Sequence, residues 1–210
     1  MKTVLAFGDS LTWGSAPGTG IRHPHESLWP TVLEAGLGGS ARVIAEGLGG
    51  RTSAYDDHSA PCDRNGARVL PVLLASHMPL DLVVIMLGTN DLKPWLCGHA
   101  LGAAAGIRRL AQIVRTFPYE KPGIGVPQVM LVAPPFCCDT ADGGPAGGRS
   151  IAESKALAPQ YKAVAEEIGA AFFDAGTVAK VSPIDGVHLV AGETEALGKA
   201  LVEPVRALLA

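Results

Sequence analysis

The stretch TVLAFGDSLTWG, residues 3–14, decides the fold. Within it, an apolar run ends at a glycine that is followed by two polar residues. Residues 3–7 have the length and apolar character of a buried parallel strand. Gly8 provides a flexible joint, and a helical turn is expected to begin beside Ser10. This arrangement would hold Ser10 at the rim of a sheet with its hydroxyl toward solvent or ligand. Taken alone, a serine in this position is more often only a helix N-cap.

Short apolar runs typical of buried parallel strands recur at residues 42–45, 80–87, 128–133 and 171–174. Segments of helical character lie between them, at residues 28–37, 65–76, 101–116, 151–168 and about 192–209. Because parallel neighbours need a crossover that covers the sheet, this alternation predicts an α/β/α three-layer sandwich with a central five-stranded parallel sheet. Asn65 and Ser150 are the expected N-caps, whereas Pro159 and Pro204 are expected to kink or break the last two helices. We expect residues 1–210 to form a single domain.

Composition and charge exclude several classes of function. The chain is 48% apolar and carries a formal net charge of −3, with its Lys and Arg residues scattered, so no basic stripe is present to bind nucleic acid. No run approaches the roughly 20 apolar residues of a membrane-spanning helix, and the first apolar run breaks at Gly8 without a signal-peptide cleavage site. The cysteine and histidine spacings match no zinc site or disulfide framework. We therefore expect a cytoplasmic protein without nucleic-acid or membrane partners, and without a metal or cofactor.

Ligands of parallel α/β sheets bind beyond the carboxyl ends of the strands, and two long loops, residues 49–65 and 134–149, are candidate walls of such a site. The segment SPIDGVHL, residues 182–189, contains the partners that a reactive Ser10 needs. The imidazole of His188 can take a hydroxyl proton near neutral pH. Asp185, three residues earlier, can turn back to orient that imidazole. An Asp-x-x-His pattern is common, so by itself it is weak evidence for a catalytic site.

Attack on an ester carbonyl creates an oxyanion, and two further segments contain candidate donors for it. LGTND, residues 87–91, follows a predicted strand and places the Asn90 amide at its end. EGLGGRT, residues 46–52, follows another strand, where Gly50 would let its backbone N–H approach the same oxygen. Read alone, both segments are also ordinary turns.

Together and in this order, the four segments resemble the SGNH hydrolases, also called the GDSL esterases, over nearly the whole chain. The resemblance implies a flavodoxin-like SGNH hydrolase fold and a small ester as substrate. It also implies Ser10 as nucleophile, His188 as base and Asp185 as the group that orients the base. The oxyanion hole would consist of the backbone N–H groups of Ser10 and Gly50 and the side chain of Asn90.

The longer motifs GDSLTWG and IMLGTND are similar to the arylesterase branch of that family, which includes acyltransferases and perhydrolases. This similarity implies hydrolysis of short acyl or aryl esters through an acyl-serine, and assembly into a homo-oligomer such as an octamer. In that branch Ala often stands at Gly50 and a second Trp at Ser15, so acyl transfer to alcohols or peroxide stays an open alternative. Carbohydrate O-deacetylation is another, as is a non-catalytic flavodoxin-like binding module whose glycine-rich loops cradle phosphate.

Three residues near these motifs are candidate substrate contacts, namely Trp13, Arg51 and Trp95. Trp13 is equally consistent with a core residue, and Trp95 with an interface anchor. Asp9 and Asp91 are expected to hold the nucleophile loop by hydrogen bonds and to take no part in the chemistry.

Overall fold

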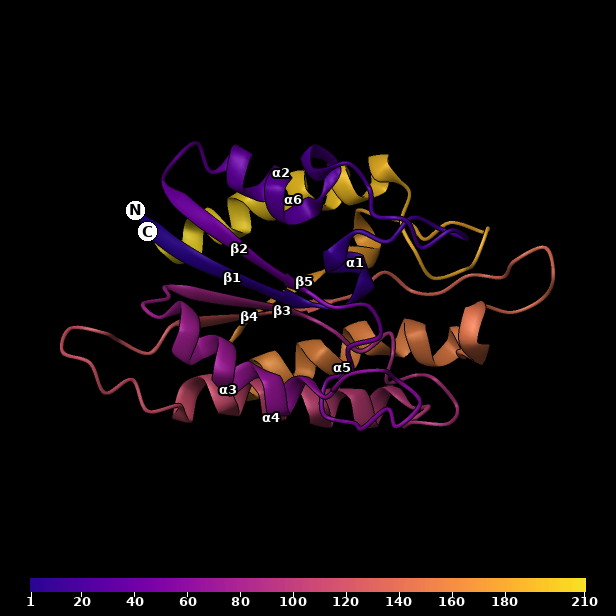
Figure 1. Ribbon diagram of the computed structural model, residues 1–210, viewed down its shortest axis with the longest axis horizontal. Coiled ribbons are helices and arrows are strands. Elements are labelled where there is room, and N and C mark those ends of the chain that lie inside the picture. The colour runs from indigo at the N-terminus through magenta and orange to yellow at the C-terminus, as the bar shows by residue number, and fades with distance from the viewer.

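The computed structural model describes residues 1–210 and contains one sheet of five parallel strands. The strands are β1 (Lys2–Gly8), β2 (Ala41–Gly47), β3 (Leu82–Met86), β4 (Gln128–Ala133) and β5 (Ala171–Asp174), in the spatial order β2-β1-β3-β4-β5. Helices cover both faces of this sheet, as Figure 1 shows. The predicted three-layer sandwich with a five-stranded parallel sheet is confirmed.

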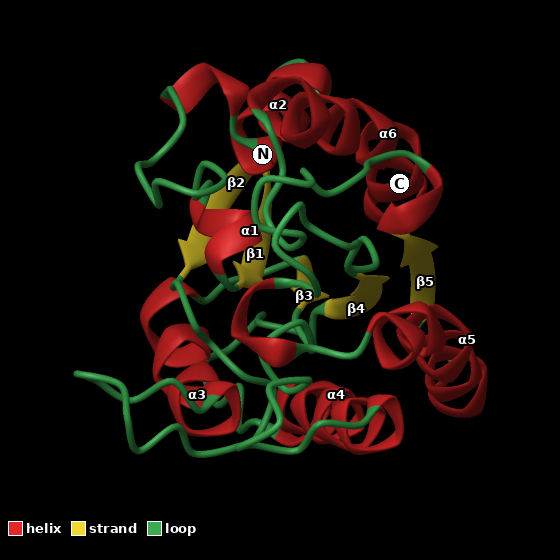
Figure 2. Ribbon diagram, turned by 90° about the vertical axis from the view of Figure 1, so that its right-hand side faces the viewer, coloured by secondary structure: helices red, strands yellow, loops and turns green.

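The helices divide between the two faces of the sheet (Figures 1 and 2). On one face α2 (Trp29–Gly36) packs against α6 (Ala191–Leu209). The other face is covered by α3 (Gly66–His77), α4 (Ala100–Thr116) and α5 (Ile151–Ile168). A short helix, α1 (Ser10–Trp13), follows β1, and there are three 3-10 turns, η1 (His25–Ser27), η2 (Ala146–Gly148) and η3 (Ala175–Thr177).

Helices α2 to α6 begin and end within one residue of the ranges expected from the sequence. Asn65 caps α3 and Ser150 caps α5, each by accepting a hydrogen bond from a backbone N–H of the first turn. None of the helices combines the length and the apolar content that a bilayer crossing requires.

Of the kink or break predicted at two prolines, the break is wrong. Pro159 lies inside α5 and Pro204 inside α6, and both helices are continuous; α3 likewise contains Pro71. A proline in a helix removes one backbone hydrogen bond and costs about 3 kcal/mol. Buried side chains on both sides of Pro159, those of Leu157 and Tyr161, hold the two halves of α5 against the sheet. Tertiary packing therefore outweighs the local cost.

Each central strand contributes side chains to two hydrophobic cores, because successive residues of a strand point to opposite faces. The core beneath α3, α4 and α5 contains Leu5, Phe7, Val83 and Ile85. The core beneath α2 and α6 contains Val4, Ala6, Leu82 and Val84. Burial on both faces is the reason that β1 and β3 have uninterrupted apolar sequences.

The strand order reverses its direction between β1 and β3. From β1 the chain passes to β2 on one side, and then returns across β1 to reach β3 on the other. The loops that follow β1 and β3 therefore separate at the carboxyl edge of the sheet, which is where ligands of open α/β sheets bind. Figure 2 looks onto these loops, whereas both chain termini lie at the opposite edge in Figure 1.

Candidate active site

Ser10 is the first residue of α1, immediately beyond the end of β1. The N-cap of this helix is Asp9, whose carboxylate accepts a hydrogen bond from the Leu11 N–H at 2.9 Å. The alternative that Ser10 is only an N-cap is therefore wrong. Gly8 makes the tight passage possible, because a Cβ at this position would lie 2.0 Å from Oγ1 of Thr12.

The loop before α6 brings His188 and Asp185 to Ser10, although 178 positions separate His188 from Ser10 in the sequence. The Nε2 atom of His188 lies 3.0 Å from Oγ of Ser10, and its Nδ1 atom lies 2.8 Å from Oδ2 of Asp185. Hydroxyl, imidazole and carboxylate thus form one continuous hydrogen-bonded chain. This geometry can move the hydroxyl proton to Nε2 while Nδ1 donates to the carboxylate.

Asp185 is held in its ionised form. Partial burial by itself raises its pKa, but hydrogen bonds from the backbone and imidazole of His188 and from the N–H groups of Gly18 and Val187 outweigh burial and lower the pKa to about 2. These four donors lie 2.8 to 3.0 Å from the carboxylate oxygens. An ionised acceptor at Nδ1 keeps a proton on that nitrogen, so Nε2 is free to accept one.

Two of the three predicted oxyanion donors, Gly50 and Asn90, lie on the loops after β2 and β3. Gly50 has a φ of +82°, and its backbone N–H donates to no acceptor within the protein. The Nδ2 atom of Asn90 donates to Oδ2 of Asp9 and to the backbone carbonyl of Arg51, each at 3.1 Å. Both amide hydrogens of Asn90 therefore have acceptors already, and one must be shared if the amide is to bind an oxyanion.

The two buried aspartates beside these motifs stabilise different loops. Asp9 accepts hydrogen bonds from Leu11 and Asn90, and so links the loop after β1 to the loop after β3. Asp91 has no exposed surface and accepts from the Ser53 N–H at 2.9 Å, so it holds the loop after β2. Burial raises the pKa of both carboxyl groups, to about 7 for Asp91. The prediction that both hold the nucleophile loop is correct for Asp9 and wrong for Asp91.

Arg149 is a residue of this region that sequence reasoning missed. Its guanidinium is buried at the end of the loop 134–149 and donates to the side-chain oxygen of Asn90 at 2.9 Å and to the carbonyl of Thr89 at 2.7 Å. Fifty-nine positions separate Arg149 from Asn90. An arginine at the end of a polar loop has no sequence signal for such a contact.

The three candidate substrate contacts occupy different environments. Trp13 is half-buried and belongs to neither hydrophobic core, and the guanidinium of Arg22 lies 5.2 Å from its ring centre. Arg51 is only 3% exposed, and its guanidinium donates to the backbone carbonyl of Gly8 at 2.8 Å. Arg51 thus ties the loop after β2 to the end of β1, and the predicted contact with substrate would require this arrangement to open. Trp95 is 59% exposed, which is compatible both with a substrate contact and with an interface anchor.

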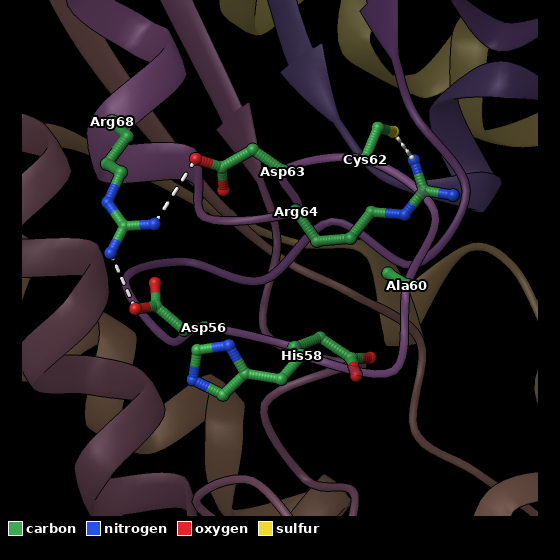
Figure 3. Close-up of a pocket in the computed structure, with 8 residues that line it drawn as sticks. Asp56, His58, Ala60, Cys62, Asp63, Arg64 and Arg68 are labelled. Carbon is green, nitrogen blue, oxygen red and sulfur yellow. Dashed lines mark hydrogen bonds and ion pairs between the residues drawn. The ribbon is translucent and has the colours of Figure 1, made fainter.

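A polar pocket of about 280 Å³ lies within the loop after β2 (Figure 3). Arg68 closes one side of it through an ion pair with Asp56. Arg64 lies on the other side, where its Nη1 atom donates to Sγ of Cys62 at 2.8 Å. A Cβ placed on Gly50 would lie 3.2 Å from Nε of Arg64. The guanidinium of Arg64, which is paired with a thiol and with no carboxylate, therefore lies next to the predicted oxyanion donor Gly50.

Comparisons with known proteins agree with one another. The sequence model of the GDSL-like lipase/acylhydrolase family matches residues 6–193. The chain is 61% identical to a provisionally assigned arylesterase from Agrobacterium tumefaciens str. C58, with all of both chains covered and a TM-score of 0.97. It is 51% identical to a carbohydrate acetylesterase family member from Sinorhizobium meliloti, covering 100% of this chain and 99% of that one, with a TM-score of 0.94. An aryl esterase from M. smegmatis is 38% identical over all of both chains, with a TM-score of 0.93. No curated protein matches significantly.

Proposed function

Because the chain belongs to the GDSL-like lipase/acylhydrolase family and is a serine esterase of that family, we propose that it hydrolyses short acyl esters through an acyl-Ser10 intermediate. The resemblance to the SGNH hydrolases inferred from the sequence is thereby confirmed. The observation that carries the proposal is the hydrogen-bonded chain from Oγ of Ser10 through His188 to Asp185. The family assignment also favours catalysis over the flavodoxin-like binding module that the sequence left open.

Acylation begins when Nε2 of His188 takes the proton of Ser10 and Oγ attacks the ester carbonyl carbon. The carbonyl π electrons move to its oxygen, and the resulting imidazolium is stabilised by the carboxylate of Asp185. His188 then gives its proton to the leaving alcohol as the carbon–oxygen bond breaks, and the acyl group remains on Ser10. Asp185 stays ionised throughout, as its pKa of about 2 requires.

The developing oxyanion is proposed to bind the backbone N–H groups of Ser10 and Gly50 and the amide of Asn90. The free N–H of Gly50 supports this assignment, since a donor without a partner can bind the oxyanion without first breaking a bond. In the second half-reaction, His188 takes a proton from water, whose oxygen attacks the acyl carbon. His188 then returns this proton to Oγ as the bond between Oγ and the acyl carbon breaks, which yields the acid and the free Ser10 hydroxyl.

The acceptor of the acyl group decides between hydrolysis and transfer. When an alcohol or a peroxide takes the place of water, the same acyl-Ser10 gives a new ester or a peracid. The relatives named as arylesterases and as a carbohydrate acetylesterase support aryl and sugar acetates as substrates of this chain. Product analysis with an added alcohol distinguishes these outcomes, because hydrolysis alone yields only acid.

A cytoplasmic location is part of the proposal. The four cysteines, Cys62, Cys97, Cys137 and Cys138, are unpaired, which is usual in compartments where thiols are kept reduced.

The direct test of the function is the release of p-nitrophenol from p-nitrophenyl acetate. Wild type should turn the ester over, and Ser10→Ala should abolish turnover because no acyl-enzyme can form. Ser40→Ala is a matched control, since the side chain of Ser40 bonds only the carbonyl of Leu37 in the turn before β2. Turnover by Ser10→Ala at the wild-type rate would overturn the proposal.

A further inference from the structure

Arg149 is a buried cation that forms no direct ion pair with a carboxylate, although the charges of Asp9 and Asp185 favour its charged form. Only 8% of the residue is exposed, and burial lowers the pKa of its guanidinium. Its three hydrogen bonds all go to neutral oxygen atoms, those of Thr89, Asn90 and Ala146. Burying a charge without an ion pair is unfavourable, so the contacts of this side chain call for a functional explanation.

The guanidinium bridges two loops at the edge of the sheet. Its Nε atom donates to the Thr89 carbonyl at 2.7 Å, and Nη2 donates to Oδ1 of Asn90 at 2.9 Å, both in the loop after β3. Nη1 donates to the carbonyl of Ala146 in the loop 134–149. Because a guanidinium is planar and its donors diverge at set angles, the two backbone contacts determine where Nη2 points.

This contact determines which way the Asn90 amide faces. With Oδ1 on the cation, Nδ2 faces the carboxylate of Asp9 and the carbonyl of Arg51. A reversed amide would place its oxygen against two acceptors and its N–H₂ group against a cationic donor. A charge-assisted hydrogen bond to the amide oxygen also draws electron density from the nitrogen, which makes the N–H a stronger donor.

We propose that Arg149 is a positioning residue for the reaction: it orients and polarises the Asn90 amide, and thereby strengthens Asn90 as an oxyanion donor. The inference rests on the proposed roles of Ser10 and Asn90. Arg149 acts through Asn90, so its contribution exists only while the amide is present. It also couples the loop 134–149 to the oxyanion hole.

A double-mutant cycle with Asn90→Ala tests this inference. Arg149→Met removes all donors but keeps an unbranched side chain about as long as the aliphatic stem of the arginine. Loss of a hydrogen bond from a charged group should lower kcat for p-nitrophenyl acetate by about ten- to hundredfold with little change in KM, since the contact matters in the transition state. In the Asn90→Ala background, the same change should lower kcat no further. Affinity for a boronic acid, which forms a tetrahedral adduct with an active serine, should fall by the same factor as kcat.

Ser154→Ala is the control for general loosening of the loop. Ser154 accepts a hydrogen bond from the Cys137 N–H at 2.9 Å and so anchors the same loop to α5 without contact to Asn90. This variant should keep the wild-type kcat. If Arg149→Met does not fold, Arg149→Lys replaces it in the cycle, because Lys keeps the charge but lacks the planar set of donors.

The possible failures are distinguishable. If Asn90→Ala slows the enzyme but the Arg149 variant lowers kcat by its full factor again in that background, the positioning role of Arg149 is overturned while the proposed function stands. If Ser10→Ala is as fast as wild type, the proposed function fails, and the inference fails with it. If Asn90→Ala is as fast as wild type, Asn90 is not an oxyanion donor, and the inference fails while hydrolysis through acyl-Ser10 stands.

Discussion

The carboxyl group of Asp91 has no exposed surface, and its Oδ2 atom lacks a hydrogen-bond partner, as does Oγ of Ser53. Burial raises its pKa to about 7 in the folded protein, whereas an aspartate in an unfolded chain titrates near about 3.9. Between these two values the folded state holds a proton that the unfolded state has lost. This group therefore favours folding most at low pH, and its contribution falls as the pH rises from about 4 to about 7.

Asp91→Asn should remove this loss of stability, because the amide is neutral at every pH and is nearly isosteric with the protonated acid. We expect the free energy of unfolding of the variant to exceed that of wild type at about pH 8, with the difference shrinking toward about pH 5. Urea unfolding at the two pH values measures it. Asp142→Asn, at an exposed position, is the control for loss of one charge. Equal pH dependence in wild type and Asp91→Asn would contradict the account.

Asp185→Asn tests the orienting role of the carboxylate. The amide can donate to Nδ1 of His188 and so favour the tautomer that has its proton on Nε2, which cannot accept the proton of Ser10. We expect kcat to fall by about 10⁴-fold, as in other enzymes with this arrangement. Steady-state kinetics with p-nitrophenyl acetate measures it, and Asp139→Asn, at an exposed position, should keep the wild-type rate. A loss no larger in Asp185→Asn than in the control would show that Asp185 does not orient His188.

At the scale of elements, the position of Ser10 depends on how closely α1 packs against the ends of β1 and β2. Gly8 and Gly47 are partners in the register of these strands. A Cβ on Gly47 would lie 2.2 Å from the backbone nitrogen of Trp13, so α1 rests directly on β2. Two glycines at facing positions let the helix that holds the nucleophile approach the sheet.

Gly47→Ala should therefore displace α1, destabilise the protein by about 1–3 kcal/mol as overpacking does, and slow turnover as well. Gly49→Ala is the matched control in the next turn, because a Cβ there would meet nothing within 4 Å. Urea unfolding and ester turnover of both variants measure the effect. Equal stability of the two variants would show that the crossing tolerates a side chain.

The sequence predicted helices and strands well where periodicity and burial agree. Strand β4 and helix α5 have the expected bounds because apolar patterning and flanking polar residues act locally. Pro159 misled the prediction because its helix is held by distant packing. Likewise, local sequence could not predict that Arg51 turns to the carbonyl of Gly8 or that Arg149 reaches Asn90, since both contacts join residues far apart in the chain.

Ser10, His188 and Asp185 illustrate the opposite case. Each residue alone is weak evidence for catalysis. They could be assigned to one site from the sequence only because one reaction needs all three and one family has them in this order. The structure places their atoms within hydrogen-bond distance. Their catalytic roles stay predictions that the substitutions above test.

At the scale of the whole molecule, the site is assembled from loops at the carboxyl edge of one sheet, between two helical layers (Figure 2). The expected homo-oligomer is a prediction about the outer surface of this domain. Leu101, Ile184 and Trp95 are exposed apolar side chains that an interface between copies would cover. Light scattering should give a mass that is a multiple of 21.6 kDa, whereas a mass of one chain at every concentration would contradict self-association.

The identity of the nucleophile is the central claim, and reaction with a fluorophosphonate followed by peptide mass spectrometry tests it most directly. We predict one adduct per chain, located on Ser10, with no labelling of Ser10→Ala and slow labelling of His188→Ala. An adduct on another residue, or labelling of Ser10→Ala at the wild-type rate, would contradict the account.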